Sequence, residues 1–323
     1  MKQDTKRTFI LCTLLILYII LAILGVYNVG SASILPILSV PYALHIAKNN
    51  YSIGIHALYN VTAGVAIFSI TGGVESVIIY IIGIGIPAYA ASCFYKKKLS
   101  LPSIIIYTAI INASAMLLYQ VLMKVLGVNY ELQYILYTEK IKTVFIPILM
   151  EQVANINGMV DKNFELQLTE TLINNFELIK QLFSSLLIIN AFVCTTIQVL
   201  IMHGVLRIKD KSLPKFGELL EFRVSKVVIL FLVVAMTLVG TASNASSGTV
   251  ILGVNVLVVT YMLFMILGLL SMIGLIRKSS VNKGMKVMSS IFLVIIIMFA
   301  PTLLILNGFL DTLFNFRKVT LVV

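Results

Sequence analysis

The feature that most limits the fold of this chain is a set of long stretches without a single charged side chain. Seven of them have 20 residues or more. About 20 consecutive, mostly apolar residues let one α-helix cross the hydrocarbon core of a bilayer. A segment surrounded by lipid satisfies its own backbone hydrogen-bonding groups when it is helical, so we expect helices here. The stretches without Asp, Glu, Lys or Arg are residues 8–47, 49–74, 76–95, 99–123, 181–206, 227–276 and 287–310.

The composition agrees with an all-α protein, a polytopic bundle of transmembrane helices. Hydrophobic residues make up 59% of the chain and charged residues only 11%, against roughly 25% charged residues in soluble domains. The mean hydropathy is +1.03. Dividing the longest stretches at Asn, Gly and Pro breaks gives nine spans. The predicted spans are residues 8–27, 31–47, 53–71, 75–95, 101–126, 181–206, 225–243, 249–276 and 286–307.

The basic residues predict a multi-pass protein of the cell membrane with a cytoplasmic N-terminus. In this orientation 17 of the 24 Lys and Arg residues fall in inner segments, as the positive-inside rule requires. Nine spans then place Arg317 and Lys318 outside, whereas one re-entrant segment would reduce the count to eight. The number of spans and the side of the C-terminus therefore stay open at this point.

A long connection, residues 127–180, divides the chain and carries seven acidic residues. Phe164, Leu168, Leu172 and Phe176 recur every four residues, which is typical of a helix with one apolar face. This segment would lie on the outer membrane surface or cover the bundle; alternatively, it would form a lid over an outward-facing site. The expected divisions are a five-span N-terminal bundle at 1–128, an extracytoplasmic amphipathic helical insert at 129–180, and C-terminal spans with an interfacial tail at 181–323.

The net charge of +11 does not indicate nucleic-acid binding, because no basic stretch is interleaved with exposed aromatic residues. Excess Lys and Arg in the inner loops of a membrane protein explains it better. Cys12, Cys93 and Cys194 lie within apolar runs and form no CxxC pattern. We therefore expect no disulfide framework, no metal site and no cofactor. The lipid bilayer is the partner that the composition implies.

A small set of polar side chains inside predicted spans provides the candidate ligand-binding residues. His56 and Asn60 are four residues apart and share one helix face with Gly64. This stripe is either a helix-packing face or one wall of a polar pocket, joined by Asn112 and Asn190 from other spans. Glu75 follows Gly72 and Gly73 at a span end. It is either an interfacial carboxylate near a helix N-terminus or a ligand contact. The candidate ligand-binding residues are His56, Asn60, Glu75, Asn112 and Asn190.

The motifs of common enzymes and ATPases are absent from the sequence. There is no HExxH, no Gly-x-Ser-x-Gly, no P-loop and no series of carboxylates in the spans. Gly83-x-Gly85-x-Pro87 is expected to give a kinked, closely packed helix. We predict no catalytic residues and no enzymatic activity. Any ATP-driven transport would need a separate ATPase.

The C-terminal segment from Gly308 to Lys318, with the sequence GFLDTLFNFRK, resembles the C-terminal signature of the YybS-like family. These are multi-span membrane proteins of Gram-positive bacteria without an assigned function. The resemblance extends to the overall plan of apolar N-terminal half, long central connection and closing spans. The tail motif is either an interfacial anchor or a functional or assembly element. Its residues are Gly308, Asp311, Phe316, Arg317 and Lys318.

The first half of that family is similar to the substrate-binding membrane components of energy-coupling-factor transporters. This resemblance implies partner docking through an AxxxA motif, which Ala43 and Ala47 match. It also implies a shared coupling protein with its ATPase module as partner. The sequence departs from that group by four additional spans and the insert.

Two functional hypotheses follow. The first is a small-molecule-binding or transport-associated subunit that works with separate membrane proteins or a coupling ATPase module, its ligand unknown. The alternative is a non-catalytic scaffold or assembly partner in cell-envelope, sporulation or division processes. A membrane-embedded enzyme is disfavoured, because no acid, base and nucleophile converge.

Overall fold

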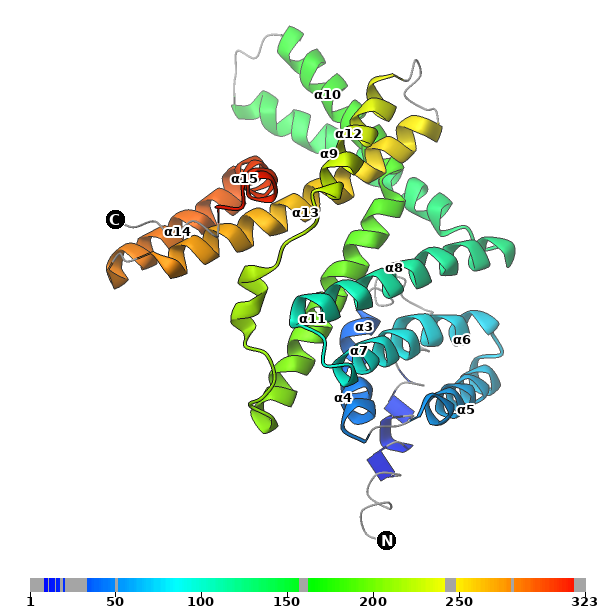
Figure 1. Cartoon of the computed structure of the whole chain (residues 1–323). Helices are drawn as coiled ribbons and strands as arrows, with labels where there is room; N and C mark the ends of the chain where they lie inside the picture. Colours follow the sequence, from blue (N-terminus) through cyan, green and yellow to red (C-terminus); the bar gives the residue numbers. More distant parts are fainter. Residues whose placement is uncertain are drawn as a thin grey trace. The chain divides into compact units, whose positions relative to one another are not determined.

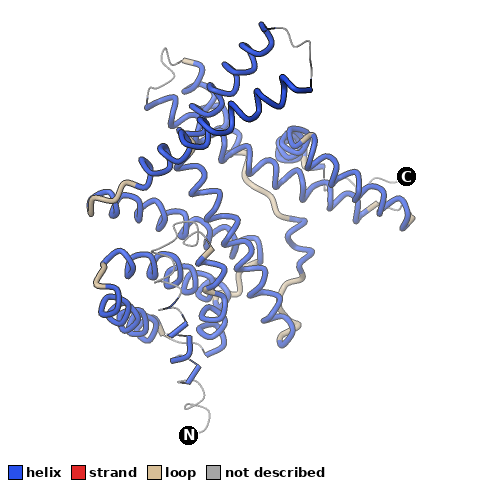
Figure 2. The backbone as a smooth tube through the Cα atoms, turned by 180° about the vertical axis from the view of Figure 1, so that it is seen from behind, coloured by secondary structure: helices blue, strands red, loops and turns tan. Residues whose placement is uncertain are grey.

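The computed structural model describes residues 9–10, 12–14, 16–17, 20, 34–49, 52–156, 162–241, 248–279 and 282–316. Within these residues every regular element is a helix, and none of this part is drawn as a strand (Figures 1 and 2). The predicted all-α class is confirmed. Most of the predicted span 8–27 lies outside the described residues, as do Arg317 and Lys318.

Residues 35–125 form short helices together with two long ones, α5 (Ile53–Thr71) and α8 (Leu101–Val125). The chain turns between them at Gly72, which adopts a left-handed conformation with φ of 67°, and at Lys97 and Lys98. The elements are α3 (Leu35–Leu38), α4 (Val40–Asn49), α5 (Ile53–Thr71), α6 (Val74–Tyr80), the π-helical turn η1 (Ile81–Gly85), α7 (Ile86–Lys96) and α8 (Leu101–Val125).

The remainder contains the longest helices. α9 continues through Pro147 without interruption. The elements are α9 (Tyr130–Ile156), α10 (Lys162–Gln181), α11 (Phe183–Lys209), the 3₁₀ turn η2 (Phe216–Glu221), α12 (Val227–Gly240), α13 (Gly248–Lys278), α14 (Lys283–Phe299) and α15 (Pro301–Phe314).

Local capping chemistry sets several helix ends. The hydroxyl of Ser52 accepts a hydrogen bond from the N–H of Ile55 at 3.4 Å at the start of α5. The side chain of Asn282 accepts one from the N–H of Met285 at 2.9 Å at the start of α14. Both caps satisfy a backbone donor that the first helical turn leaves without an intrahelical acceptor.

In the described part of the chain five helices are long and apolar enough to cross a membrane, and each coincides with a predicted span. A sixth crossing results if α14 and α15 count as one span. The chain is therefore a multi-pass membrane protein in contact with the lipid bilayer. The five helices are Ile53–Thr71, Val74–Lys96, Leu101–Val125, Phe183–Ile208 and Gly248–Lys278.

The prediction of eight or nine spans is not confirmed in the described part of the chain. Residues 31–47 include two short helices that meet at Ser39. α12 has 14 residues, which gives about 21 Å at 1.5 Å per residue, against a hydrocarbon core of about 30 Å. The predicted span 286–307 is broken between α14 and α15, which enclose an angle of 109°. Pro301 has no backbone N–H with which to continue the first helix. This bend fits the re-entrant segment that charge counting left open.

The chain forms two compact units, and three of the long helices contribute to both. In the first unit α4 packs on α7 and α3 packs on η1; in the second α9 pairs with α10. The division of the sequence at 128 and 180 stays a prediction. The first unit contains residues 1–119, 187–226 and 261–323, and the second contains residues 120–186 and 227–260.

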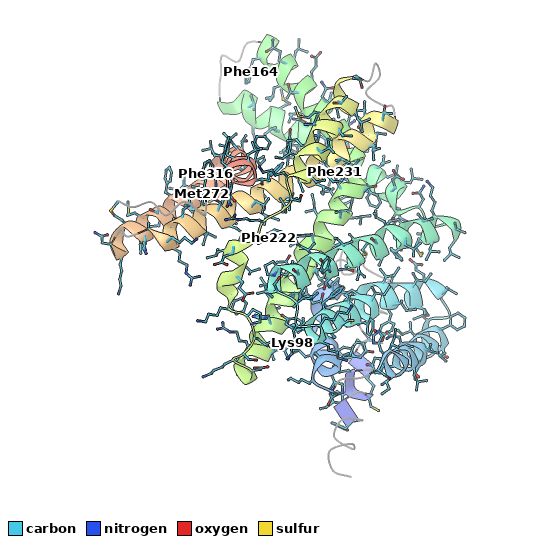
Figure 3. The ribbon with its side chains drawn as sticks, viewed as in Figure 1. Lys98, Phe164, Phe222, Phe231, Met272 and Phe316 are labelled. Carbon is cyan, nitrogen blue, oxygen red and sulfur yellow. The ribbon has the colours of Figure 1, made fainter. Side chains whose placement is uncertain are left out.

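α9 and α10 form a helical hairpin in the segment predicted as a helical insert (Figure 1). Lys142 lies 2.6 Å from Glu139 and 3.1 Å from Glu177, and Lys180 is paired with both carboxylates. Phe164, labelled in Figure 3, is exposed, whereas Leu168, Leu172 and Phe176 of the predicted apolar face are half-buried. The placement of the hairpin outside the cell stays a prediction.

The four-charge cluster makes the hairpin sensitive to pH. Hydrogen bonds from Lys142 and Lys180 lower the pKa of Glu139, and bonds from Lys180 and Lys142 lower the pKa of Glu177. Hydrogen bonds to Glu139 and Glu177 raise the pKa values of both lysines. The carboxylates thus stabilise the hairpin fully above their unfolded pKa of about 4.3, and the lysines do so below about 10.4. The ion pairs between the lysines and the glutamates should weaken as the pH falls below about 4.3 or rises above about 10.4.

Spin labels on exposed positions of α9 and α10 would measure this response in distance distributions between pH 3 and pH 11. We expect broader distributions at both extremes. Glu139→Gln/Glu177→Gln should already show the broad distribution at pH 7. Glu165→Gln/Glu170→Gln, which alters the charge of α10 outside the cluster, should behave as wild type. Identical acid responses of the cluster variant and wild type would contradict the assignment.

A close helix crossing in the first unit joins α13 and α15. A Cβ on Gly308 would overlap the carbonyl oxygen of Phe264 and lie 2.7 Å from the nitrogen of Gly268. The amide of Asn307 donates to the carbonyl of Gly268 at 3.1 Å. Small residues allow such backbone approach within membranes. Beside the crossing, Met265, Leu269, Ile276 and Met272 (labelled in Figure 3) pack against a core of Leu293, Ile296 and Leu304.

Candidate functional site

The structure places His56 and Asn60 on one face of α5, one helical turn apart. The amide nitrogen of Asn60 donates to the backbone carbonyl of His56 at 2.8 Å and lies 3.1 Å from Nε2 of the imidazole. The polar stripe predicted from their spacing is therefore observed. It faces α4 and α7 within the first unit.

Tyr42 of α4 completes a hydrogen-bonded cluster with these two side chains. Its phenol oxygen lies 2.7 Å from Nδ1 of His56 and accepts a hydrogen bond from the Asn60 amide at 3.3 Å. The proton of the contact between Tyr42 and His56 lies either on the phenol oxygen or on Nδ1, depending on the tautomer of the imidazole. We call Tyr42, His56 and Asn60 the α5 polar cluster.

Stacked aromatic rings surround the α5 polar cluster. The ring of His56 lies 4.5 Å from that of Tyr89 on α7, and the ring of Tyr42 lies 4.5 Å from that of Tyr59 on α5. Offset stacking at these distances is favourable. The cluster thus has a polar centre between two tyrosine rings.

The carboxamide oxygen of Asn60 is the exceptional atom of the cluster. It is buried and, among the described residues, has no hydrogen-bond partner. A Cβ on Gly85 would lie 2.5 Å from it, so only glycine leaves it space. Gly85 ends the π-helical turn η1, and such turns are frequent at functional sites. The close packing predicted for Gly83 and Gly85 is present, since Gly83 is in similar contact with Leu35.

The other predicted ligand-binding residues have different neighbours. Asn112 of α8 is fully buried and donates to the hydroxyl of Thr195 on α11 at 3.0 Å. The side-chain oxygen of Asn190 accepts a hydrogen bond from the thiol of Cys194 at 3.6 Å. Glu75 is half-buried in the first turn of α6, where the helix dipole favours a carboxylate. Of the five candidates, His56 and Asn60 are hydrogen-bonded to each other.

Sequence reasoning missed Tyr42, Tyr59 and Tyr89, and it also missed a buried polar row along α11. The amide of Gln198 donates to the hydroxyl of Ser39 at 2.8 Å, three residues after Thr195 on the same face. The tyrosine hydroxyls inside apolar stretches were the available signal. Their partners come from other helices, so spacing along the sequence could not identify them.

Ala43 and Ala47, predicted to dock a partner, lie on α4. Ala43 is fully buried against α7, where the hydroxyl of Ser92 donates to its carbonyl at 2.7 Å. Ala47 is half-buried. Part of this small-residue face is thus used within the chain, and its role in docking stays a prediction.

The described part of the tail motif is divided between two environments. Gly308 lies at the crossing of α13 and α15, and Phe316 is half-buried beside Phe314. Asp311 is 4% exposed and lines a cavity of about 360 Å³ together with Arg223 and Lys226. No group of three or more His, Cys, Asp or Glu side chains in the described residues could hold a metal ion.

Comparison with known protein families shows to which family the chain belongs. Residues 16–312 match the family described as "Predicted membrane protein (DUF2232)". The chain belongs to this family. The match covers nearly the whole sequence, and the family description agrees with the membrane-spanning helices of the structure. No curated protein and no solved structure matches the chain.

Proposed function

We propose that this protein is a small-molecule-binding or transport-associated subunit with the α5 polar cluster as its ligand site. The observation that carries the proposal is the buried carboxamide oxygen of Asn60, which lacks a partner among the described residues. A buried acceptor without a donor costs about 1–3 kcal/mol. A ligand that directs an N–H or O–H group to this oxygen would recover that free energy.

The neighbouring groups define the kind of ligand. The cluster combines one imidazole with a phenol and a carboxamide, and it contains no carboxylate. A neutral molecule with a hydrogen-bond donor fits it better than an ion. The stacked rings of Tyr59 and Tyr89 would favour a ligand with a flat ring. The cluster holds no carboxylate, thiol or serine hydroxyl to act as a nucleophile beside the imidazole, which supports binding rather than catalysis.

Access to the site would come from movement of α5. Only 17% of this span is buried in the protein, so few protein contacts hold it. Gly72 and Gly73 join it to α6, and Gly72 has a left-handed conformation. A small rotation at these glycines would separate Asn60 from Gly85 and open the cluster.

Transport would require partners, because the sequence has no P-loop. The resemblance to the YybS-like family and to the binding components of energy-coupling-factor transporters suggests a separate coupling protein with ATPases. A cytoplasmic N-terminus, as predicted from the basic residues, belongs to the same proposal.

Substitution of Asn60 by leucine tests the site. Asn60→Leu keeps the branching and the number of side-chain heavy atoms but removes both polar groups, so the protein should remain about as stable as wild type. Binding of the co-purifying ligand should fall by about 10-fold or more, since one hydrogen bond in a dry site is worth about 1.4 kcal/mol or more. Native mass spectrometry of detergent-purified protein would measure the occupancy of small-molecule adducts.

Thr62→Val is the matched control, because Thr62 lies on the same helix, is exposed and bonds only to the backbone of Leu58. It should keep wild-type occupancy. Absence of any small-molecule adduct on wild type, together with no thermal stabilisation by a metabolite library, would contradict the proposal. That result would favour the scaffold hypothesis.

A further inference from the structure

A second cavity, of about 660 Å³, lies in the first unit between the loop that follows α11 and the last turns of α13. Four basic side chains line it and outnumber the two acidic ones, Glu218 and Glu221. In the described residues no ion pair joins Lys211, Lys215 or Arg277 to a carboxylate. The four basic residues are Lys211, Lys215, Arg277 and Lys278.

Hydrogen bonds and a ring contact order the loop that forms one wall of this cavity. The carbonyl of Pro214 lies 2.9 Å from Nε2 of His203 on α11, and the ring of Phe216 meets the same imidazole edge-on at 5.0 Å. The carboxylate of Asp210 accepts hydrogen bonds from the hydroxyl and N–H of Ser212. These contacts fix the loop up to η2, which ends before Phe222 (labelled in Figure 3).

Arg277 is held against the loop by a glycine. A Cβ on Gly217 would lie 2.7 Å from the guanidinium of Arg277, so the guanidinium rests directly on the backbone there. On the other side, the ammonium of Lys286 donates to the carbonyl of Arg277 at 3.2 Å. The guanidinium presents several N–H donors in a planar fork that suits a phosphate group.

The cavity also lies at the end of two candidate membrane spans. The α11 span ends at Ile208 and the α13 span ends at Lys278. Lipid phosphates occupy the layer just beyond the hydrocarbon core, and basic residues near that layer attract anionic headgroups. Exposed cations in a preformed cavity at this depth are therefore placed to meet a phosphate.

We infer that this cavity binds a phosphate-bearing anion, and its position favours the headgroup of an anionic phospholipid over soluble phosphate. Its apolar wall, which includes Leu213 and Leu220, would contact the glycerol and the first acyl carbons. The inference does not depend on a ligand at the α5 polar cluster. The two sites can therefore fail or succeed separately.

The test measures phospholipid binding to the delipidated full-length protein in neutral detergent. Short-chain phosphatidylglycerol should bind more tightly than short-chain phosphatidylcholine. Lys215→Gln/Arg277→Gln should weaken phosphatidylglycerol binding by about 10-fold or more. Lys96→Gln/Lys97→Gln, which removes the same charge at the end of another span, should change it less than about 2-fold. Equal losses in the two variants, or equal binding of both lipids, would overturn the inference.

Two further variants separate charge from folding. Lys215→Arg keeps the charge and leaves the planar fork of Arg277 in place, so it should retain most of the binding. Gly217→Ala keeps every charge and shifts only the flexible end of Arg277, so it should also retain most of the binding. A loss of phosphatidylglycerol affinity in Gly217→Ala as large as that in Lys215→Gln/Arg277→Gln would count against charge as the basis of binding.

Inorganic phosphate forms the last arm of the test. If millimolar phosphate leaves phosphatidylglycerol bound, the lipid headgroup is the ligand. If phosphate displaces the lipid from wild type, and Lys215→Gln/Arg277→Gln also loses phosphate binding, the cavity is confirmed as the binding site. Its ligand is then the soluble anion and not the lipid headgroup.

Discussion

Gly308→Ala is expected to destabilise the protein by at least about 2 kcal/mol, because overpacking of a tight contact costs about 1–3 kcal/mol or more. The added methyl group would overlap the carbonyl oxygen of Phe264 and the backbone of Gly268. Backbone atoms of two helices cannot yield as the end of a flexible side chain can, so α13 and α15 must separate. Unfolding in mixed micelles by titration with a denaturing detergent measures the loss.

Gly240→Ala provides the matched control. Gly240 ends α12, and no atom lies within 4 Å of its Cβ position. Alanine is a better helix former than glycine by about 1 kcal/mol, so this variant should be as stable as wild type or slightly more so. Equal stability of Gly308→Ala and Gly240→Ala would contradict the close crossing of α13 and α15.

The second large effect is expected from Ser39→Ala, at about 1–2 kcal/mol of lost stability. Ser39 and Gln198 are both fully buried. The serine hydroxyl donates to the carbonyl of Pro36 at 2.7 Å and accepts from the Gln198 amide at 2.8 Å. Among the described residues the side-chain oxygen of Gln198 already lacks a partner. Removal of the hydroxyl would leave the amide nitrogen without an acceptor as well.

The double variant Ser39→Ala/Gln198→Leu should recover most of this loss. Replacement of both partners by apolar groups removes the unsatisfied amide, whereas removal of one partner exposes its full desolvation cost. The same unfolding titration on wild type, both single variants and the double variant gives the coupling energy. Additive losses in the double variant would contradict the hydrogen bond.

Much of the membrane architecture could be predicted because charge and length are local properties. The expected spans 53–71 and 101–126 correspond to Ile53–Thr71 and Leu101–Val125, since polar caps and lysines bound the apolar runs. The predicted count of eight or nine spans is not confirmed in the described residues, where length alone was insufficient to identify a span. Fourteen residues of α12 and the bend between α14 and α15 shorten the continuous helices.

The candidate site was only partly predictable. The four-residue spacing of His56 and Asn60 placed both side chains on one face, and they are hydrogen-bonded. Asn112 was assigned to the same pocket because it is polar and lies in a span. Its recorded partner is Thr195, because helix pairing decides which polar groups meet. The roles of these residues in ligand binding stay predictions.

The charge-free stretches by themselves determined that this chain is helical and embedded in the membrane, because about 20 apolar residues have no other stable arrangement in lipid. Only the tertiary structure decided which of the few polar groups meet. Tyr42 reaches His56 from another helix, and Gly85 leaves space for Asn60 across the interface with η1. Such contacts depend on how helices pack, a long-range property that composition and spacing do not contain. The depletion of charge that specifies the membrane also makes each remaining buried polar group energetically consequential.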